Sequence, residues 1–255
     1  MSVPSLEQRL NRTKIMLGDE KLNQLQNSFV VIVGIGAVGG YALEAIARSG
    51  VNNIRVVDFD KIEESNINRQ ILATNQTINR YKAQLALERI KSINPYCQVD
   101  KQILFVSDAN IETVLSGGFG FDKPSLVIDA IDAVSSKIVL LSNCLKKQIP
   151  AISSMGAALR SKTQYITTDD IMKTKGCGLA KQVRIGLKPY LATPKSLSGI
   201  DCVYSTQPVE QTIYDACKQH NEGKKTLGSL PTIPGIFGLM LANMAIEKLT
   251  QDKSI

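Results

Sequence analysis

Short apolar runs alternate with amphipathic stretches along the first 155 residues of the chain. The run FVVIV at 29–33 is continuous and rich in β-branched residues, as is typical of a strand buried on both faces of a parallel sheet. The pattern predicts strands at 29–33, 54–58, 98–106, 126–132 and 151–155, and helices at 5–27, 42–50, 79–92, 109–116 and 135–147. Alternating elements of these lengths predict an α/β fold with a Rossmann-type, doubly wound, mostly parallel sheet.

The pattern changes after Met155, because residues 157–205 are more polar and basic. It predicts strands at 163–167 and 202–206, a helix near 179–188, a long loop at 206–234 and a final helix at 235–250. We expect a single domain over residues 1–255. Its nucleotide-binding core covers about 25–156, and a basic C-terminal extension with a crossover loop covers about 157–234, before the last helix.

The composition is ordinary for a globular protein, with 255 residues, 44% apolar and 21% charged. The formal net charge of +7 favours acidic partners such as nucleic acid, although a solvated basic surface explains it equally well. No run approaches the roughly 18–20 apolar residues that cross a bilayer, and the first residues lack the apolar core of a signal peptide. We therefore expect a cytoplasmic protein with no membrane partner.

The cysteines are scattered and form no C-x-x-C pair, so we expect neither a four-cysteine zinc site nor a disulfide framework. Cys202 precedes Val203 and Tyr204 in an expected strand, which favours a buried structural thiol over a sulfur or acyl acceptor. The five cysteines are Cys97, Cys144, Cys177, Cys202 and Cys217.

A glycine loop, GIGAVGG, follows the first expected strand and opens a helix. Gly34 permits the tight turn, Gly36 lets the backbone approach a phosphate, and Gly39 lets the helix pack close to the strand. The helix then offers unpaired N–H groups to an anion. Asp58, at the end of the second strand, is placed to accept hydrogen bonds from ribose. The loop predicts nucleotide binding, with NAD as one possibility.

Cations after the second strand favour ATP over NAD. The segment NINRQ supplies Arg69, and Lys82 lies on the helix expected at 79–92. A triphosphate needs such counter-charges, and Asn66 and Gln70 can add neutral hydrogen bonds. Both cations could instead lie on solvated faces, which is common for Lys and Arg.

The segment IDAID places Asp129 and Asp132 at the end of a central strand, where open α/β sheets bind their ligands. One carboxylate there can hold Mg²⁺ against phosphates, since this ion prefers few protein oxygens. Asp132 could instead cap the next helix, or Ser135 could cap it while Asp132 binds the metal.

These motifs together resemble the adenylating enzymes of the ubiquitin-activating, ThiF and MoeB type. The matching segments are RLNRT at 9–13, GIGAVGG, VVDFD, NINRQ with Lys82, INP at 93–95, and IDAID. The resemblance implies catalysis by four residues, with an arginine of the N-terminal helix reaching the partner's ATP site in a homodimer. Arg12 matches that arginine better than Arg9 does. The four are Arg12, Arg69, Lys82 and Asp132.

The resemblance also implies a nucleotide site and its cofactors, namely ATP and Mg²⁺ held by Asp132, without zinc, and it leaves a monovalent cation open as a third. The residues that would bind the nucleotide are Gly34, Gly36, Gly39, Asp58, Asn66, Arg69, Gln70, Lys82 and Asp132.

The second half is similar to one branch of this family, the tRNA threonylcarbamoyladenosine dehydratases. The similarity lies in SSMGAA at 153–158, DCVYSTQPVE at 201–210 and GSLPTIPGIFG at 228–238. It implies ATP-dependent cyclisation of threonylcarbamoyladenosine at position 37 of tRNA through carboxylate adenylation. It also allows a cysteine desulfurase system as a partner.

The basic segment offers candidate contacts to the tRNA backbone, which would make binding sensitive to salt. A solvated basic face is the alternative. The candidates are Arg160, Lys162, Lys173, Lys175, Lys181, Arg184 and Lys188. Three other functions stay open: an activator of a ubiquitin-like sulfur carrier, a catalytically silent ATP-binding scaffold, and a nicotinamide-dependent dehydrogenase.

Overall fold

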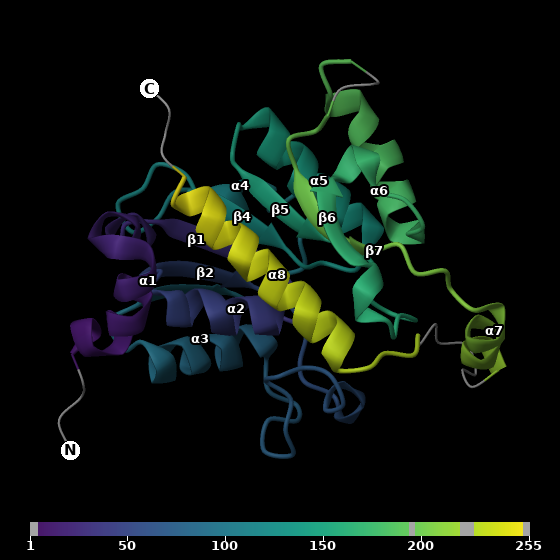
Figure 1. Ribbon diagram of the computed structural model, residues 1–255, viewed down its shortest axis with the longest axis horizontal. Helices are drawn as coiled ribbons and strands as arrows, with labels where there is room; N and C mark the ends of the chain where they lie inside the picture. The colour runs from purple at the N-terminus through teal and green to yellow at the C-terminus, as the bar shows by residue number, and fades with distance from the viewer. Residues whose placement is uncertain (1–4, 194–196, 220–226, 252–255) are drawn as a thin grey trace.

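The computed structural model describes residues 5–193, 197–219 and 227–251, in which seven strands form one sheet (Figure 1). The strand order is β3-β2-β1-β4-β5-β7-β6. Every neighbouring pair is parallel except β6 and β7, which are antiparallel at one edge. The strands are β1 Phe29–Val33, β2 Asn53–Val57, β3 Gln98–Gln102, β4 Leu126–Asp129, β5 Ala151–Ser154, β6 Ile166–Asp170 and β7 Asp201–Ser205. The predicted doubly wound, mostly parallel sheet is confirmed.

Helices cover both faces of the sheet (Figure 1). One layer holds α1 Leu6–Gln26, α2 Gly39–Ser49, α3 Lys82–Ile93 and α8 Thr232–Leu249, and the other holds α4 Ile111–Leu115, α5 Val134–Lys146 and α6 Gly178–Leu187. In β1, Val30 and Ile32 belong to the core under the first layer, whereas Val31 and Val33 belong to the core under the second. A central strand with two helical layers has no polar face, which explains its continuous apolar sequence.

The chain after residue 156 extends the sheet, which the sequence pattern did not predict. It contributes β7 beside β5, and then β6 as the antiparallel edge strand. The strand expected at 163–167 begins only at Ile166, because residues 163–165 form a 3-10 turn. The basic segment is therefore part of the fold rather than an extension beyond it.

The expectation of a continuous loop at 206–234 is wrong, because α7 occupies Gln211–Gln219. This helix lies apart from the sheet, at the right of Figure 1. Part of the expected loop, 220–226, lies outside the described residues. Three further 3-10 turns complete the described elements: η1 Glu64–Asn66, η3 Ile171–Lys173 and η4 Lys188–Tyr190.

The last helix packs on the helix that follows the glycine loop. A Cβ atom added at Gly238 of α8 would lie 2.3 Å from the carbonyl oxygen of Val38 and 2.8 Å from Cβ of Tyr41. Glycine thus lets α8 approach the backbone of α2, and this contact supports the start of α2. Although α8 is strongly apolar, none of the described helices has the length and apolar character to span a membrane.

We expect Gly238→Ala to lower the free energy of unfolding by about 3 kcal/mol, the upper part of the range for overpacking. The clash with Val38 must outweigh the gain in helix propensity, which is about 1 kcal/mol. Urea unfolding followed by circular dichroism measures the change. Gly178→Ala is the control, because a Cβ atom there meets nothing within 4 Å. Equal stability of both variants would show that α2 and α8 do not need this close contact.

Candidate active site

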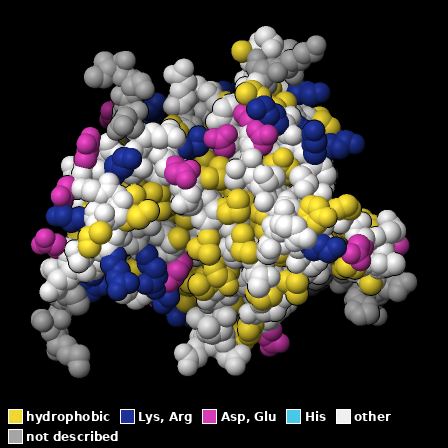
Figure 2. All heavy atoms as spheres, viewed as in Figure 1, with side chains coloured by type: hydrophobic (Ala, Val, Ile, Leu, Met, Phe, Trp, Pro, Cys, Tyr) yellow, Lys and Arg dark blue, Asp and Glu magenta, His cyan; other side chains and the backbone are white. Residues whose placement is uncertain are grey.

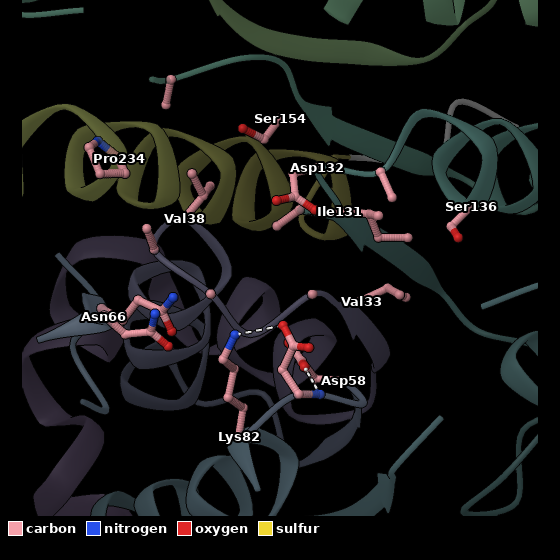
Figure 3. A pocket seen from close by; sticks show the side chains of 18 of the residues that line it. Val33, Val38, Asp58, Asn66, Lys82, Ile131, Asp132, Ser136, Ser154 and Pro234 are labelled. Carbon is pink, nitrogen blue, oxygen red and sulfur yellow. Dashed lines mark hydrogen bonds and ion pairs between the residues drawn. The ribbon is translucent and has the colours of Figure 1, made fainter. Parts of the chain in front are cut away.

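A cavity of about 640 Å³ opens at the carboxyl edge of the sheet (Figure 3). Its walls come from the segments that follow β1, β2, β3, β4 and β5, together with the chain just before α8. Its volume suits a ligand of nucleotide size, and its place is where open α/β sheets bind ligands. In the close-up, Asp132 and Ser154 lie on one side and Asn66 and Lys82 on the opposite side.

The glycine loop forms the floor of this cavity. Gly34 has a φ of +87°, and its N–H donates to Val57 O at 2.9 Å. Gly34 and Gly36 line the cavity, as predicted. Gly39 does not line it, so its expected contact with the nucleotide is not supported. A Cβ atom at Gly39 would lie 1.8 Å from Gly34 O, which confirms its predicted packing role.

Asp58 is buried at the cavity wall, where its carboxylate orders two backbone segments. Its Oδ2 accepts from the N–H of Ile35 at 2.6 Å, and its Oδ1 accepts from the N–H of Asp60 at 2.8 Å. Burial raises the pKa of the Asp58 carboxyl above its usual value, while Lys82 and these two hydrogen bonds oppose the rise. Asp58 is therefore a fixed acceptor facing the ligand, and its contact with ribose stays a prediction.

The two predicted cations both reach the cavity. Lys82 is only 6% exposed, so the expectation of a solvated lysine is wrong for it. Its Nζ lies 2.9 Å from Oδ2 of Asp60, the second acid of VVDFD, a partner that sequence reasoning missed. Arg69 donates to Ser65 O at 2.7 Å and to Oδ1 of Asn68 at 2.8 Å. The structure thus places two cationic side chains at the wall of one cavity.

The two amides of NINRQ are buried against the same cavity. Oδ1 of Asn66 accepts from the N–H of Glu63 at 3.2 Å. Oε1 of Gln70 is buried and finds no hydrogen-bond donor among the described residues. An unsatisfied buried acceptor costs free energy, so a donor on the ligand would be favoured there. This orphaned oxygen and the bare glycine floor fit a nucleotide.

The acids of IDAID have different surroundings. Asp129 is fully buried and pairs with Lys137, whereas Asp132 lines the cavity with an exposed side chain. No side-chain capping bond forms at the start of α5, whose N-cap is Ala133, so the expected caps by Asp132 and Ser135 are wrong. The exposed carboxylate of Asp132 fits Mg²⁺, which keeps waters and takes phosphate oxygens as its other ligands.

The far wall of the cavity was not predicted as part of the site. It includes 154–158 after β5, Leu179 and Ser229. The side-chain amide of Asn68 donates to Ser229 O at 3.1 Å, which joins this wall to the NINRQ segment. Phe59 and Phe105 stand at the opposite rim with ring centroids 5.0 Å apart. The conspicuous small-residue segment SSMGAA was the available signal for the far wall.

The N-terminal arginines lie outside this cavity. Arg12 is exposed on α1 and does not line the cavity of its own chain. Arg9 donates to Ile93 O at 2.6 Å, which ties α1 to the end of α3. Arg9 therefore supports the fold, whereas Arg12 is exposed and lies outside the cavity of its own chain.

The basic segment is mostly exposed, with one clear exception. The exposed members are Lys162, Lys173, Lys175, Lys181 and Lys188. Figure 2 shows Lys and Arg side chains gathered over α6 at the upper right. Arg184 is half-buried and donates to Thr174. Arg160 is buried, donates to Gln207 O and Gly176 O, and has its pKa lowered by burial. The expectation that Arg160 contacts tRNA is therefore wrong.

The cysteine thiols lie away from the cavity, and most are buried. Cys202 has no exposed surface in β7, and burial raises its pKa. Burial likewise raises the pKa of Cys97 and of Cys144 to about 12. A buried neutral thiol is a poor nucleophile, which agrees with the predicted structural role of Cys202.

Comparisons with known proteins agree with this site. The model of the ThiF family matches residues 8–255. The tRNA threonylcarbamoyladenosine dehydratase of Bacillus subtilis (strain 168) is 33% identical over 97% of this chain and 96% of its own length. The molybdopterin-synthase adenylyltransferase of Escherichia coli (strain K12) is 31% identical, over 61% of this chain and 60% of its own length.

A solved structure is similar over almost the whole chain. It is the E. coli tRNA N6-threonylcarbamoyladenosine dehydratase, TcdA, in complex with ATP. The TM-score is 0.85 at 32% identity, and 97% of each chain is covered. The family match, the near full-length similarity and the cavity at the carboxyl edge lead to one conclusion: this chain belongs to the ThiF family.

Proposed function

We propose that the chain catalyses the ATP-dependent dehydration of threonylcarbamoyladenosine at position 37 of tRNA. The observation that carries the proposal is similarity to dehydratases over nearly the whole chain, including the part after β5 that builds the far wall of the cavity. The ATP in the similar solved structure supports ATP as the nucleotide. The cations, the orphaned oxygen of Gln70 and the exposed carboxylate of Asp132 suit the same ligand.

The proposed reaction begins with adenylation of the substrate. A carboxylate oxygen of the threonyl group attacks the α-phosphorus of ATP, and pyrophosphate leaves. The neighbouring carbamoyl group then attacks the activated carbonyl carbon, closes the ring and expels AMP. Arg69 and Lys82 would offset charge on the phosphates, which is the electrostatic contribution that dominates such chemistry. Asp132 would hold Mg²⁺, which supplies further charge neutralisation when bound.

The exposed lysines on and before α6 would hold the tRNA. Lys181 and Lys188 are seven residues apart on and just after this helix, and Lys175 precedes it. Leu179, at the first turn of the same helix, lines the cavity. A line of cations that starts beside the cavity suits a polyanion whose modified base must enter it. The lysines would thus bind the phosphate backbone of the tRNA, and the cavity would bind its modified base.

A homodimer would complete the site. Figure 2 shows apolar side chains gathered along the middle of one face, over α8, where Leu239 is 51% exposed. On α1, Ile15 and Met16 are also strongly exposed. An apolar face of this kind favours association with a second copy. Association would let Arg12 of one chain approach the cavity of the other.

Activation of a sulfur carrier is the second candidate. The similarity to a molybdopterin-synthase adenylyltransferase favours it, but that similarity covers only 61% of this chain. The similarity to the dehydratase of Bacillus subtilis covers 97% of this chain, which favours the tRNA substrate over a sulfur carrier.

The test is nucleoside mass spectrometry of tRNA carrying threonylcarbamoyladenosine after incubation with protein, ATP and Mg²⁺. We expect the cyclic nucleoside, 18 Da lighter by loss of water, with the wild-type chain. We expect at least 100-fold slower product formation with Asp132→Ala, a loss comparable with that of other charge-stabilising groups. Release of pyrophosphate only when a sulfur carrier is added, or full activity of Asp132→Ala, would contradict the assignment.

If Arg12 acts across a dimer, two inactive variants should complement each other. We expect Arg12→Ala and Asp132→Ala to be inactive separately. Each isolated heterodimer contains one intact site of two, so its activity should recover to roughly half of the wild-type value. Differently tagged subunits allow the heterodimer to be isolated before the assay. Inactive heterodimers would show that Arg12 serves its own chain or serves no catalytic role.

Cys202→Ala should keep kcat within threefold of the wild type, because the thiol is buried, protonated and outside the cavity. In the folded protein a disulfide reagent at pH 8 should label Cys217 quickly and the four buried cysteines only after urea is added. A folded Cys202→Ala protein that has lost activity would instead favour a covalent sulfur or acyl intermediate.

A further inference from the structure

A fully buried ion pair lies beneath the Asp132 side of the cavity. Nζ of Lys137 lies 2.5 Å from Oδ2 of Asp129, and neither side chain has any exposed surface. In every other ion pair identified within the described residues, at least one partner is a third exposed or more. Removing two charges from water costs about as much free energy as their attraction returns, so such a pair is a poor source of stability. Its presence at a ligand site indicates another role.

The pair holds the ends of two strands and the start of a helix together. The three N–H groups of Lys137 are matched by Asp129, by Oγ of Ser153 at 3.2 Å and by Ser154 O at 3.0 Å. The hydroxyl of Ser153 donates in turn to Oδ2 of Asp129 at 2.5 Å. Asp129 ends β4, Ser153 and Ser154 end β5, and Lys137 lies in the first turn of α5. Every donor of the ammonium is therefore satisfied, which fixes these segments relative to one another.

The same network reaches the loop that carries Asp132. Oδ1 of Asp129 accepts from the N–H of Ile131 at 3.1 Å. On the other side of the loop, the N–H of Ala130 donates to Val33 O at 2.8 Å. Ile131, Asp132 and Ser154 all line the cavity, whereas Asp129 and Lys137 do not. The pair therefore lies outside the cavity but forms hydrogen bonds to Ile131 and Ser154, which belong to two of its walls.

We propose that the Lys137–Asp129 ion pair positions the Asp132 carboxylate for Mg²⁺ bound to the phosphates of ATP. Both members are positioning residues, because neither touches the ligand. The proposal rests on the proposed function in one respect, the assignment of Asp132 to the metal. A charge pair suits this role because its attraction and its hydrogen bonds resist small shifts that an apolar contact would tolerate.

The test removes both charges and keeps the acceptor for Ile131. In Asp129→Asn with Lys137→Met, the amide oxygen can still accept from the N–H of Ile131, and its amide can donate to Ser153. The matched control is Glu112→Gln with Lys147→Met, which neutralises an exposed ion pair between α4 and α5. The measurements are the Kd of ATP with Mg²⁺ and with EDTA, the Kd of AMP in EDTA, and the midpoint of urea unfolding.

The Kd of ATP in EDTA divided by its Kd with Mg²⁺ gives the factor by which Mg²⁺ increases the affinity. We expect this ratio to fall at least fivefold in the double variant, toward that of Asp132→Ala, while the Kd of AMP changes less than twofold. The urea midpoint should stay equal or rise, and the control should match the wild type in every measurement. A folded double variant with the wild-type ratio would overturn the proposal. A double variant that binds AMP more weakly and also unfolds at a lower urea concentration would overturn it too, because the pair would then only stabilise the fold.

These outcomes are separable from the fate of the proposed function. A wild-type chain that binds ATP more tightly with Mg²⁺ but leaves the tRNA unchanged would overturn the dehydratase proposal only. A wild-type chain whose affinity for ATP does not increase with Mg²⁺ would overturn the role of Asp132 and the positioning proposal together.

Discussion

The close approach of Gly39 to the carbonyl of Gly34 is the constraint around which the site is built. No side chain fits between the end of β1 and the start of α2 at this point. The chain therefore turns directly from strand to helix, and residues 36–38 line the cavity with the first turn of α2 behind them. Unpaired N–H groups at a helix start favour anions. Because α8 also packs on this helix through Gly238, the opposite end of the chain holds the same turn in place.

The charges around the cavity are arranged so that partners can be exchanged at low cost. Lys82 is almost buried, but its partner Asp60 keeps 46% of its side chain exposed. An ion pair with one solvated partner contributes little to stability, so the lysine can turn from Asp60 to a phosphate without a large loss. The buried Asp58, by contrast, is held by two backbone N–H groups and keeps its place. A cation with an exchangeable partner and a fixed acid suit a ligand with both a phosphate and a ribose end.

The sequence allowed the fold and much of the site to be predicted because both follow from short-range patterns. Apolar runs mark the buried strands, and residues at the ends of parallel strands converge at one edge, which is why Asp58, Lys82 and Asp132 meet around one cavity. Other features depend on distant partners. Charge counting placed Arg160 on the surface, but carbonyl groups from Gln207 and Gly176 hold it inside. Such contacts have no signature in local sequence.

The same limit applies to α7 and to Lys137. Prolines and glycines around α7 indicate a loop, and its nine residues are too few for helical periodicity to outweigh them. Lys137 lies eight residues after Asp129, and the spacing alone does not say whether its side chain turns toward the sheet or toward water. For Lys137, tertiary packing decides what the local pattern leaves open.

The two halves of the chain divide the chemistry between them. The half up to β5 carries the glycine loop, the cations and Asp132, which together suit adenylation of any carboxylate. The half after β5 supplies the far wall of the cavity, two strands at one edge of the sheet and the lysines of α6. The network of Lys137 and Asp129 joins the halves, since it binds the loop of Asp132 and the end of β5 at once. A shift of the far wall would therefore be transmitted to the loop of Asp132, and under the proposed function this would link the substrate side of the cavity to the nucleotide side.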